Sequence, residues 1–132
     1  MTLVVDASVV VSALIDSGPE GTWAEQLLSS DDLAAPHLMP VEAANILRLA
    51  ALAGDVSQDS ASMAHGDLLM LPVELFPYEP FAARVWELRA SVTAYDAWYV
   101  ALAELLGVPL ATLDKRLTRA PGSRCEFRTF GA

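Results

Sequence analysis

Four carboxylates lie in apolar stretches of this chain, where an acidic side chain is costly unless something compensates its charge. The four are Asp6, Glu42, Asp96 and Asp114. An acid that folding removes from water is normally paired with a base, protonated or bound to a cation. The chain has eight Lys and Arg against seventeen Asp and Glu, and most of those bases lie at or after Arg84. Because bases are scarce, a divalent metal ion is the simplest partner for four converging acids.

Short apolar runs alternate with helical patterns along the chain. Strands are predicted at residues 2–6, 33–35, 72–75, 108–112 and 125–130. Helices are predicted at residues 7–15, 20–28, 40–53, 57–69, 80–90, 93–107 and 115–118. This alternation is typical of an α/β protein whose parallel sheet is covered by helices on both faces. No repeat, low-complexity tract or linker divides the sequence, which predicts one domain spanning residues 1–132.

Two of the four acids follow the clearest predicted strands. Asp6 ends the first strand and Asp114 closes the strand at residues 108–112, and in parallel sheets ligands bind beyond the carboxyl ends of the strands. Glu42 and Asp96 fall in the first turns of predicted helices, which point toward the same rim. Each acid taken alone is explained as a helix cap or first-turn acid. Capping does not explain why two acids end apolar strands at the edge where ligands bind.

Two hydroxyl side chains stand close to these acids in the sequence. Ser8 follows Asp6 by two residues, and Thr112 precedes Asp114 by two, so each can face the same side as its acid. We expect both to orient the acids from a second layer around the site. A hydrogen bond within its own helix is the alternative for Ser8, and an ordinary strand position is the alternative for Thr112.

Four motifs in order resemble those of PIN-domain ribonucleases, with the spacing and length of VapC-type toxins from bacterial toxin–antitoxin pairs. The motifs are residues 4–10, residues 36–48 with Glu42, residues 93–103 with Asp96, and residues 109–117 with Asp114. The resemblance implies a three-layer α/β/α sandwich around a central, mostly parallel sheet. It also implies an endoribonuclease that depends on Mg²⁺ or Mn²⁺, forms a homodimer and is held inactive by a VapB-type antitoxin.

The resemblance assigns the metal site to the same four acids, Asp6, Glu42, Asp96 and Asp114. Hard oxygen ligands suit Mg²⁺ or Mn²⁺ rather than zinc. We hypothesise that the three aspartates hold the metal and that Glu42 binds it through water or orients the attacking water. Lys115, Arg116 and Leu117 follow the fourth motif where some family members carry a further acid. The number of metal ions bound therefore stays open.

The net charge of −9 does not exclude RNA, because metal ions would cover the acids that matter most. The basic residues expected to contact the RNA backbone are Arg84, Arg89, Lys115, Arg116 and Arg119. Each is equally well explained as a solvated surface charge. The single Cys125 excludes an intramolecular disulfide, and no signal peptide or membrane-spanning stretch is evident. These features predict a cytoplasmic protein with no membrane association.

Three other functions compete with RNA hydrolysis. A signalling receiver domain also gathers acids around Mg²⁺, but it needs paired acids after its first strand, where Asp6 stands alone. A catalytically silent binding module with the PIN fold, and a metal-dependent nuclease acting on DNA, both stay open.

Overall fold

The computed structural model describes residues 1–131 and is built around a five-stranded parallel sheet. The strands are β1 (Thr2–Val5), β2 (Asp32–Pro36), β3 (Val73–Phe76), β4 (Leu110–Ala111) and β5 (Phe127–Arg128). The helices are α1 (Ala7–Ile15), α2 (Pro19–Ser30), α3 (Met39–Leu52), α4 (Gln58–Met70), the 3₁₀ turn η1 (Glu79–Phe81), α5 (Ala82–Glu87), α6 (Ala94–Leu106) and α7 (Lys115–Arg119).

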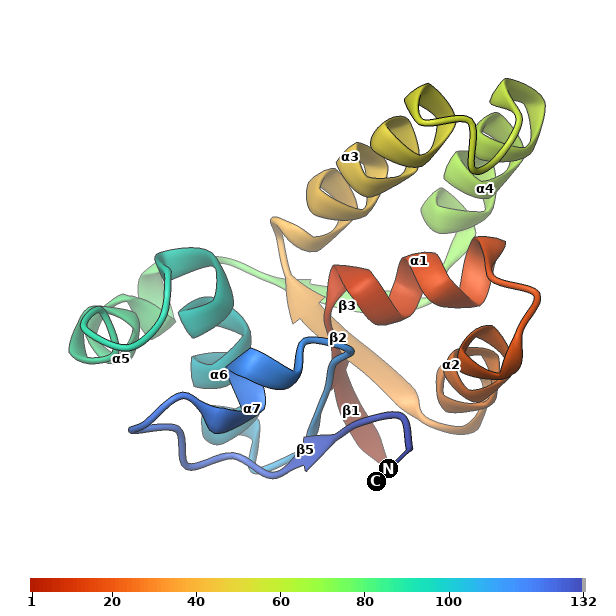
Figure 1. Ribbon diagram of the computed structural model, residues 1–132. Coiled ribbons are helices and arrows are strands. Elements are labelled where there is room, and N and C mark those ends of the chain that lie inside the picture. Colours follow the sequence, from red (N-terminus) through yellow and green to blue (C-terminus); the bar gives the residue numbers. More distant parts are fainter. Residues whose placement is uncertain (132) are drawn as a thin grey trace.

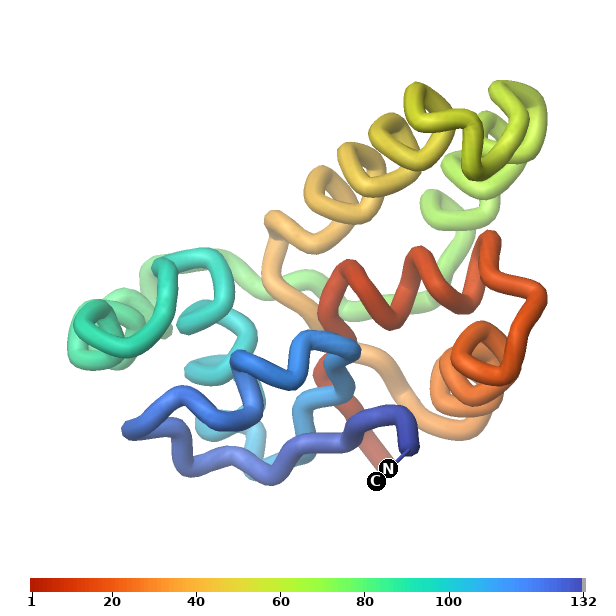
Figure 2. Tube along the Cα trace, viewed as in Figure 1, coloured from red at the N-terminus to blue at the C-terminus, as the bar shows by residue number. Residues whose placement is uncertain are grey.

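Helices cover both faces of the sheet. The strand order is β3-β2-β1-β4-β5, so the chain moves outward in one direction through β2 and β3 and returns to add β4 and β5 on the other side of β1. Right-handed crossovers then place α1–α4 on one face and α5–α7 on the other, as Figure 1 shows. Figure 2 shows the chain crossing between the two helical layers after α4, through β3 to α5. The predicted three-layer α/β/α sandwich with a parallel sheet is confirmed.

The centre of the sheet is β1, whose residues Leu3, Val4 and Val5 are fully buried. This strand pairs with β2 on one side and with β4 on the other. The direction of strand addition therefore reverses between β1 and β4, and parallel sheets bind their ligands at such a reversal point. Asp6 directly follows β1, and Asp114 lies three residues beyond the end of β4.

Helix α6 carries a third acid to the same edge. Thr93 caps its first turn, and Gly107, with a φ of 67°, ends it in the left-handed conformation that glycine adopts without strain. Between the caps, one face packs on β1, β2 and β4, so the helix is fixed against the sheet. Neither α6 nor any other helix in residues 1–131 is long and apolar enough to span a bilayer.

Three predicted elements differ from those in the structure, and one of them is the expected strand at residues 125–130, which is regular only at Phe127–Arg128. The expected helix at residues 80–90 consists of η1 and the short α5, which ends at Glu87 and is followed by turns. The expected strand at residues 108–112 is regular only at Leu110–Ala111. Pro109 has no N–H to donate, although its carbonyl accepts from the Val4 N–H at 3.0 Å. The strand β4 is therefore shorter than predicted, but Asp114 still comes after it.

Candidate active site

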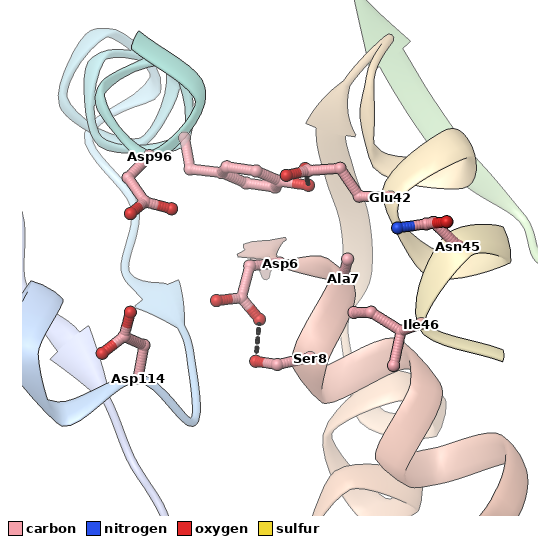
Figure 3. Close-up of a pocket in the computed structure, with 9 residues that line it drawn as sticks. Asp6, Ala7, Ser8, Glu42, Asn45, Ile46, Asp96 and Asp114 are labelled. Carbon is pink, nitrogen blue, oxygen red and sulfur yellow. Dashed lines mark hydrogen bonds between the residues drawn. The ribbon is translucent and has the colours of Figure 1, made fainter. Parts of the chain in front are cut away.

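The four acids predicted from the sequence line one pocket of about 280 Å³. Figure 3 shows Asp6, Asp96 and Asp114 turned toward a common space, with Glu42 across from them on α3. We call this hollow the acidic pocket; its lining residues are Asp6, Ala7, Ser8, Glu42, Asn45, Ile46, Asp96, Tyr99 and Asp114. Residues separated by more than one hundred positions in sequence therefore share one site.

Asp6 is the most constrained of the four. It is 9% exposed and caps α1, where its Oδ1 accepts a hydrogen bond from the Val9 N–H at 3.1 Å. The same oxygen accepts from the Ser8 hydroxyl at 2.5 Å, and Oδ2 accepts from the Thr112 hydroxyl. The capping role and the site role thus belong to the same carboxylate, and both predicted hydroxyl residues contact it directly.

The direction of these hydroxyl hydrogen bonds is fixed by the backbone. The Ser8 hydroxyl oxygen also accepts from the Leu113 N–H at 3.2 Å, and that of Thr112 accepts from the Asp114 N–H at 3.0 Å. Because a backbone N–H can only donate, each hydroxyl hydrogen is left to point at Asp6. Protonating Asp6 would deprive one of these hydroxyls of its acceptor. The network therefore favours the carboxylate form of Asp6, which accepts on both oxygens, and opposes the rise in pKa that burial causes.

Asp114 and Asp96 lie at the N-terminal ends of helices α7 and α6, on the side of the pocket opposite Glu42 (Figure 3). Asp114 caps α7, with its Oδ1 accepting from the Arg116 N–H at 2.9 Å and the Leu117 N–H at 3.3 Å. Asp96 lies in the first turn of α6, where its N–H donates to the Thr93 hydroxyl at 3.3 Å. Two short-range caps thus fix the backbone positions of both acids, and their carboxylates face the pocket (Figure 3).

Glu42 is tethered by a tyrosine. The hydroxyl of Tyr99 donates to Glu42 Oε1 at 2.6 Å, and Tyr99 is only 2% exposed. Burial raises the pKa of Tyr99, and so does the adjacent Glu42 carboxylate, so the hydroxyl remains a donor. One oxygen of Glu42 is therefore occupied by the protein, which leaves the other for a ligand in the pocket.

The pocket concentrates negative charge without a basic residue on its wall. Burial raises the pKa of Asp6 and of Asp96, and neighbouring carboxylates raise both further, whereas hydrogen-bond donors oppose the shift at Asp6. Burial also raises the pKa of Glu42, which the Tyr99 hydroxyl partly offsets. The ionised forms of Asp6, Glu42 and Asp96 are thus destabilised by their surroundings, and a bound cation would relieve all three together.

The donor set fits a hard divalent cation, for which carboxylate oxygens are preferred ligands. In residues 1–131 no three His, Cys, Asp or Glu side chains already stand at the spacing of a finished metal cage. The acids nevertheless face one space from separate elements (Figure 3), so an ion bound there would have to draw their carboxylates together. Asp6, Asp96 and Asp114 are the residues that could hold the metal directly.

The five predicted basic residues are not equally placed. Arg116 lies next to the pocket, with its Nε 3.8 Å from an oxygen of Asp114. Lys115 and Arg119 are exposed on the same helix. The guanidinium of Arg89 stacks over the Trp86 ring at 4.6 Å, away from the pocket wall.

Arg84 is the least suited of the five to contact RNA. Its Nε and Nη2 donate to the two carboxylate oxygens of Glu104 at 2.7 and 3.1 Å, and its Nη2 also donates to the Gly122 carbonyl at 2.6 Å. These contacts join α5, α6 and the segment after α7. The guanidinium is thus committed to holding the fold, whereas the sequence pattern had suggested either contact with the RNA backbone or a solvated surface charge.

Besides Ala7, which directly follows Asp6, three pocket residues were not assigned a role from the sequence. Tyr99 follows Asp96 by three positions on α6, and Asn45 and Ile46 follow Glu42 by three and four positions on α3. Residues three or four apart share one face of a helix. Helical spacing from the two acids would therefore have identified all three as neighbours of the site.

Comparison with known proteins gives consistent matches. The PIN domain family model matches residues 3–123. The chain is 42% identical to Ribonuclease VapC1 of Mycobacterium tuberculosis over 126 residues, which cover 95% of both chains. It is 37% identical to Ribonuclease VapC9 of the same species, over 93% of this chain and 94% of the relative.

Solved structures with lower sequence identity share the fold. The structure of Mycobacterium tuberculosis VapC20, a Sarcin-Ricin loop cleaving toxin, superposes with a TM-score of 0.67 at 15% identity, covering 89% of this chain and 93% of that one. VapBC2 from Rickettsia felis, bound to a DNA fragment from its promoter, gives a TM-score of 0.67 at 13% identity over 98% of both chains.

Proposed function

The chain belongs to the PIN-domain family of VapC ribonucleases, and from that premise we propose that it is a metal-dependent endoribonuclease and the toxin of a toxin–antitoxin pair. The observation that carries the proposal is the acidic pocket, in which Asp6, Asp96 and Asp114 share one space and no Lys or Arg is among the described residues that line it. Such a pocket repels a phosphodiester unless a cation is bound. RNA hydrolysis and metal binding are therefore parts of the same proposal.

We assign Mg²⁺ or Mn²⁺ to Asp6, Asp96 and Asp114. When bound, such an ion lowers the pKa of water and offsets negative charge on the phosphate oxygens. Ser8 and Thr112 favour the ionised form of Asp6 and hold it in one orientation through the hydroxyl hydrogen bonds described above. They act on the reaction only through this carboxylate.

Glu42 is proposed to orient the attacking water. Its Oε1 is occupied by the Tyr99 hydroxyl, so its remaining oxygen is the one available to accept a hydrogen bond from water. Burial and nearby carboxylates raise the pKa of Glu42, which makes it a better proton acceptor than a solvated glutamate. In this arrangement the three aspartates bind the metal ion, and Glu42 accepts a proton from the attacking water.

The proposed partners follow from the relatives. VapBC complexes with the same fold support a VapB-type antitoxin as the partner, and we propose that the chain forms a homodimer and acts in the cytoplasm, where its RNA substrate is present. An antitoxin that covers the acidic pocket or its rim would keep the enzyme inactive.

A cleavage assay on matched substrates tests the proposal. The purified protein is expected to cut single-stranded RNA in the presence of Mg²⁺ or Mn²⁺, and EDTA is expected to stop it. Asp6→Asn and Asp96→Asn should each abolish cleavage and retain the folded circular dichroism spectrum. Asp55→Asn, which removes an exposed acid from the turn after α3, is the matched control and should cleave normally.

The competing functions give different results in the same assay. Cleavage of single-stranded DNA in preference to RNA would identify a DNA nuclease. A folded protein that binds the antitoxin but cuts neither polymer with either metal would identify a silent binding module.

A further inference from the structure

A second hollow adjoins the acidic pocket and shares two of its acids. It has a volume of about 320 Å³ and lies between the start of α6 and helix α7. We call it the flanking hollow; the residues that matter in its lining are Val92, Asp96, Asp114, Arg116, Leu117 and Ala120. Because Asp96 and Asp114 line both hollows, a bound chain can pass from one to the other without leaving these acids.

The flanking hollow differs chemically from the acidic pocket. Its apolar floor is formed by Val92 and Ala120, which are partly exposed, whereas Leu117 also lines the hollow but is only 3% exposed. Its only charge besides the two shared acids is Arg116, whereas no base lines the acidic pocket. An apolar floor beside a cation is suited to a ligand that has both a flat apolar part and an anionic part.

Arg116 is available to such a ligand. Its side chain is 94% exposed, and its nearest carboxylate, that of Asp114, is 3.8 Å away, beyond hydrogen-bonding distance. No hydrogen bond from its guanidinium to any of residues 1–131 is present, in contrast to Arg84, whose guanidinium has four acceptor atoms. The guanidinium can therefore turn toward a phosphate in the hollow and bind it through two N–H groups.

The size of the hollow limits what it holds. A volume of about 320 Å³ is at the lower end for sites that enclose a small organic molecule, so it suits one nucleotide rather than a paired base step. Unstacked bases of single-stranded RNA place their faces on apolar or aromatic surfaces, which a duplex does not allow. The ligand class that fits is therefore one unpaired nucleotide of an RNA strand.

We propose that the flanking hollow is the subsite for the nucleotide next to the cleaved bond, with its base or ribose against Val92 and Ala120 and its outer phosphate on Arg116. This inference rests on the proposed ribonuclease activity. It predicts that the enzyme contacts its RNA substrate beyond the phosphate that is cleaved. One nucleotide on one side of the cleaved bond should therefore contribute strongly to kcat/KM.

A substrate-length series tests the subsite. Cut sites are first mapped on total RNA, and short single-stranded RNAs spanning one site are then trimmed by one nucleotide at a time from either end. With the wild-type protein, removing the nucleotide held in the hollow should lower kcat/KM by about tenfold or more, as loss of a charged hydrogen bond does. Arg116→Ala should cause a similar loss on the full substrate and almost none on the trimmed one.

Arg119→Ala is the matched control, because it removes the same charge from the same helix outside the hollow. It should weaken full and trimmed substrates by equal, small factors. Ala120→Phe gives a second variant, since it fills the hollow without changing charge and should also cancel the advantage of the longer RNA. Binding of a fluorescent RNA in Ca²⁺, followed by anisotropy, should show the same ranking without turnover.

The outcomes separate the two proposals. Equal losses for Arg116→Ala on full and trimmed RNA, or no difference from Arg119→Ala, would overturn the subsite and leave the ribonuclease intact. Absence of RNA cleavage by the wild-type protein, with RNA binding in Ca²⁺ also insensitive to Arg116→Ala, would overturn both. Calorimetry should show that Arg116→Ala does not lower the affinity of the protein for Mn²⁺. That result would establish that the acids of the pocket still bind metal in this variant.

Discussion

Replacing Tyr99 with Phe removes one oxygen from the interior and leaves the ring in place. Tyr99 is 2% exposed, and its hydroxyl makes a single side-chain hydrogen bond, to Glu42 Oε1 at 2.6 Å. A hydrogen bond to a charged group contributes roughly 1.5–3 kcal/mol. Because Glu42 is only half-buried, water replaces part of the lost contact. We therefore expect a loss of about 1.5 kcal/mol in the free energy of unfolding, near the lower end of that range.

The loss is measurable by urea unfolding followed by circular dichroism, with EDTA present to exclude metal. It should also lower the melting temperature by about 5 °C for a chain of this size. Tyr95→Phe is the control, because Tyr95 is 60% exposed and a surface change of this kind costs at most about 0.5 kcal/mol. In the cleavage assay Tyr99→Phe should lower kcat more than it raises KM, since Glu42 is misplaced while the aspartates are untouched.

A double-mutant cycle with Glu42→Ala isolates the contact itself. If the hydrogen bond is the source of the effect, Tyr99→Phe should cost little once Glu42 is gone, giving a coupling energy of at least about 1 kcal/mol. A coupling energy below about 0.5 kcal/mol would refute the assignment of Tyr99 as the tether of Glu42.

The network predicts further effects. Burial raises the pKa of Asp6 above its unfolded value of 3.8, so the folded state binds the carboxyl proton more tightly than the unfolded state does. The stability of the metal-free protein should therefore fall as the pH rises from about 4 toward neutrality. A series of melting temperatures measured in EDTA across this pH range should fall less steeply for Asp6→Asn than for the wild-type protein. Thr112→Val, nearly isosteric and fully buried, should destabilise the fold by about 2–4 kcal/mol in urea, because the Asp114 N–H loses its acceptor and Asp6 a donor. Arg84→Met should cost about 2 kcal/mol by leaving Glu104 unpaired, and Arg84→Met with Glu104→Met should recover much of it, with cleavage unchanged in both; slower cleavage would place Arg84 in the site after all.

The strand-end acids were predictable because the rule that places them is local. An apolar strand that ends in Asp6 or Asp114 puts the carboxylate at the ligand-binding edge wherever the strand lies in a parallel sheet. The order of the strands was not predictable in this way. It is the reversal between β1 and β4 that makes these two strand ends neighbours, and strand order depends on the whole chain.

Contacts between helices were beyond sequence reasoning. Tyr99 meets Glu42 across 57 positions, and Arg84 meets Glu104 across twenty, because α6 packs against the sheet and α5 packs against α6. Spacing within one helix shows which residues share a face, but not which side chain that face will meet. The tether of Glu42 and the structural role of Arg84 therefore emerged only from tertiary packing.

The central claim is that the acidic pocket holds a divalent metal through its three aspartates. A crystal of the protein soaked in Mn²⁺ and measured for anomalous scattering tests it directly. The account predicts an anomalous peak in contact with Asp6, Asp96 and Asp114, at about 2.1 Å from oxygen ligands, and no such peak in a crystal of Asp96→Asn. A soaked wild-type crystal with no peak in the pocket, or with a peak held by other residues, would contradict it.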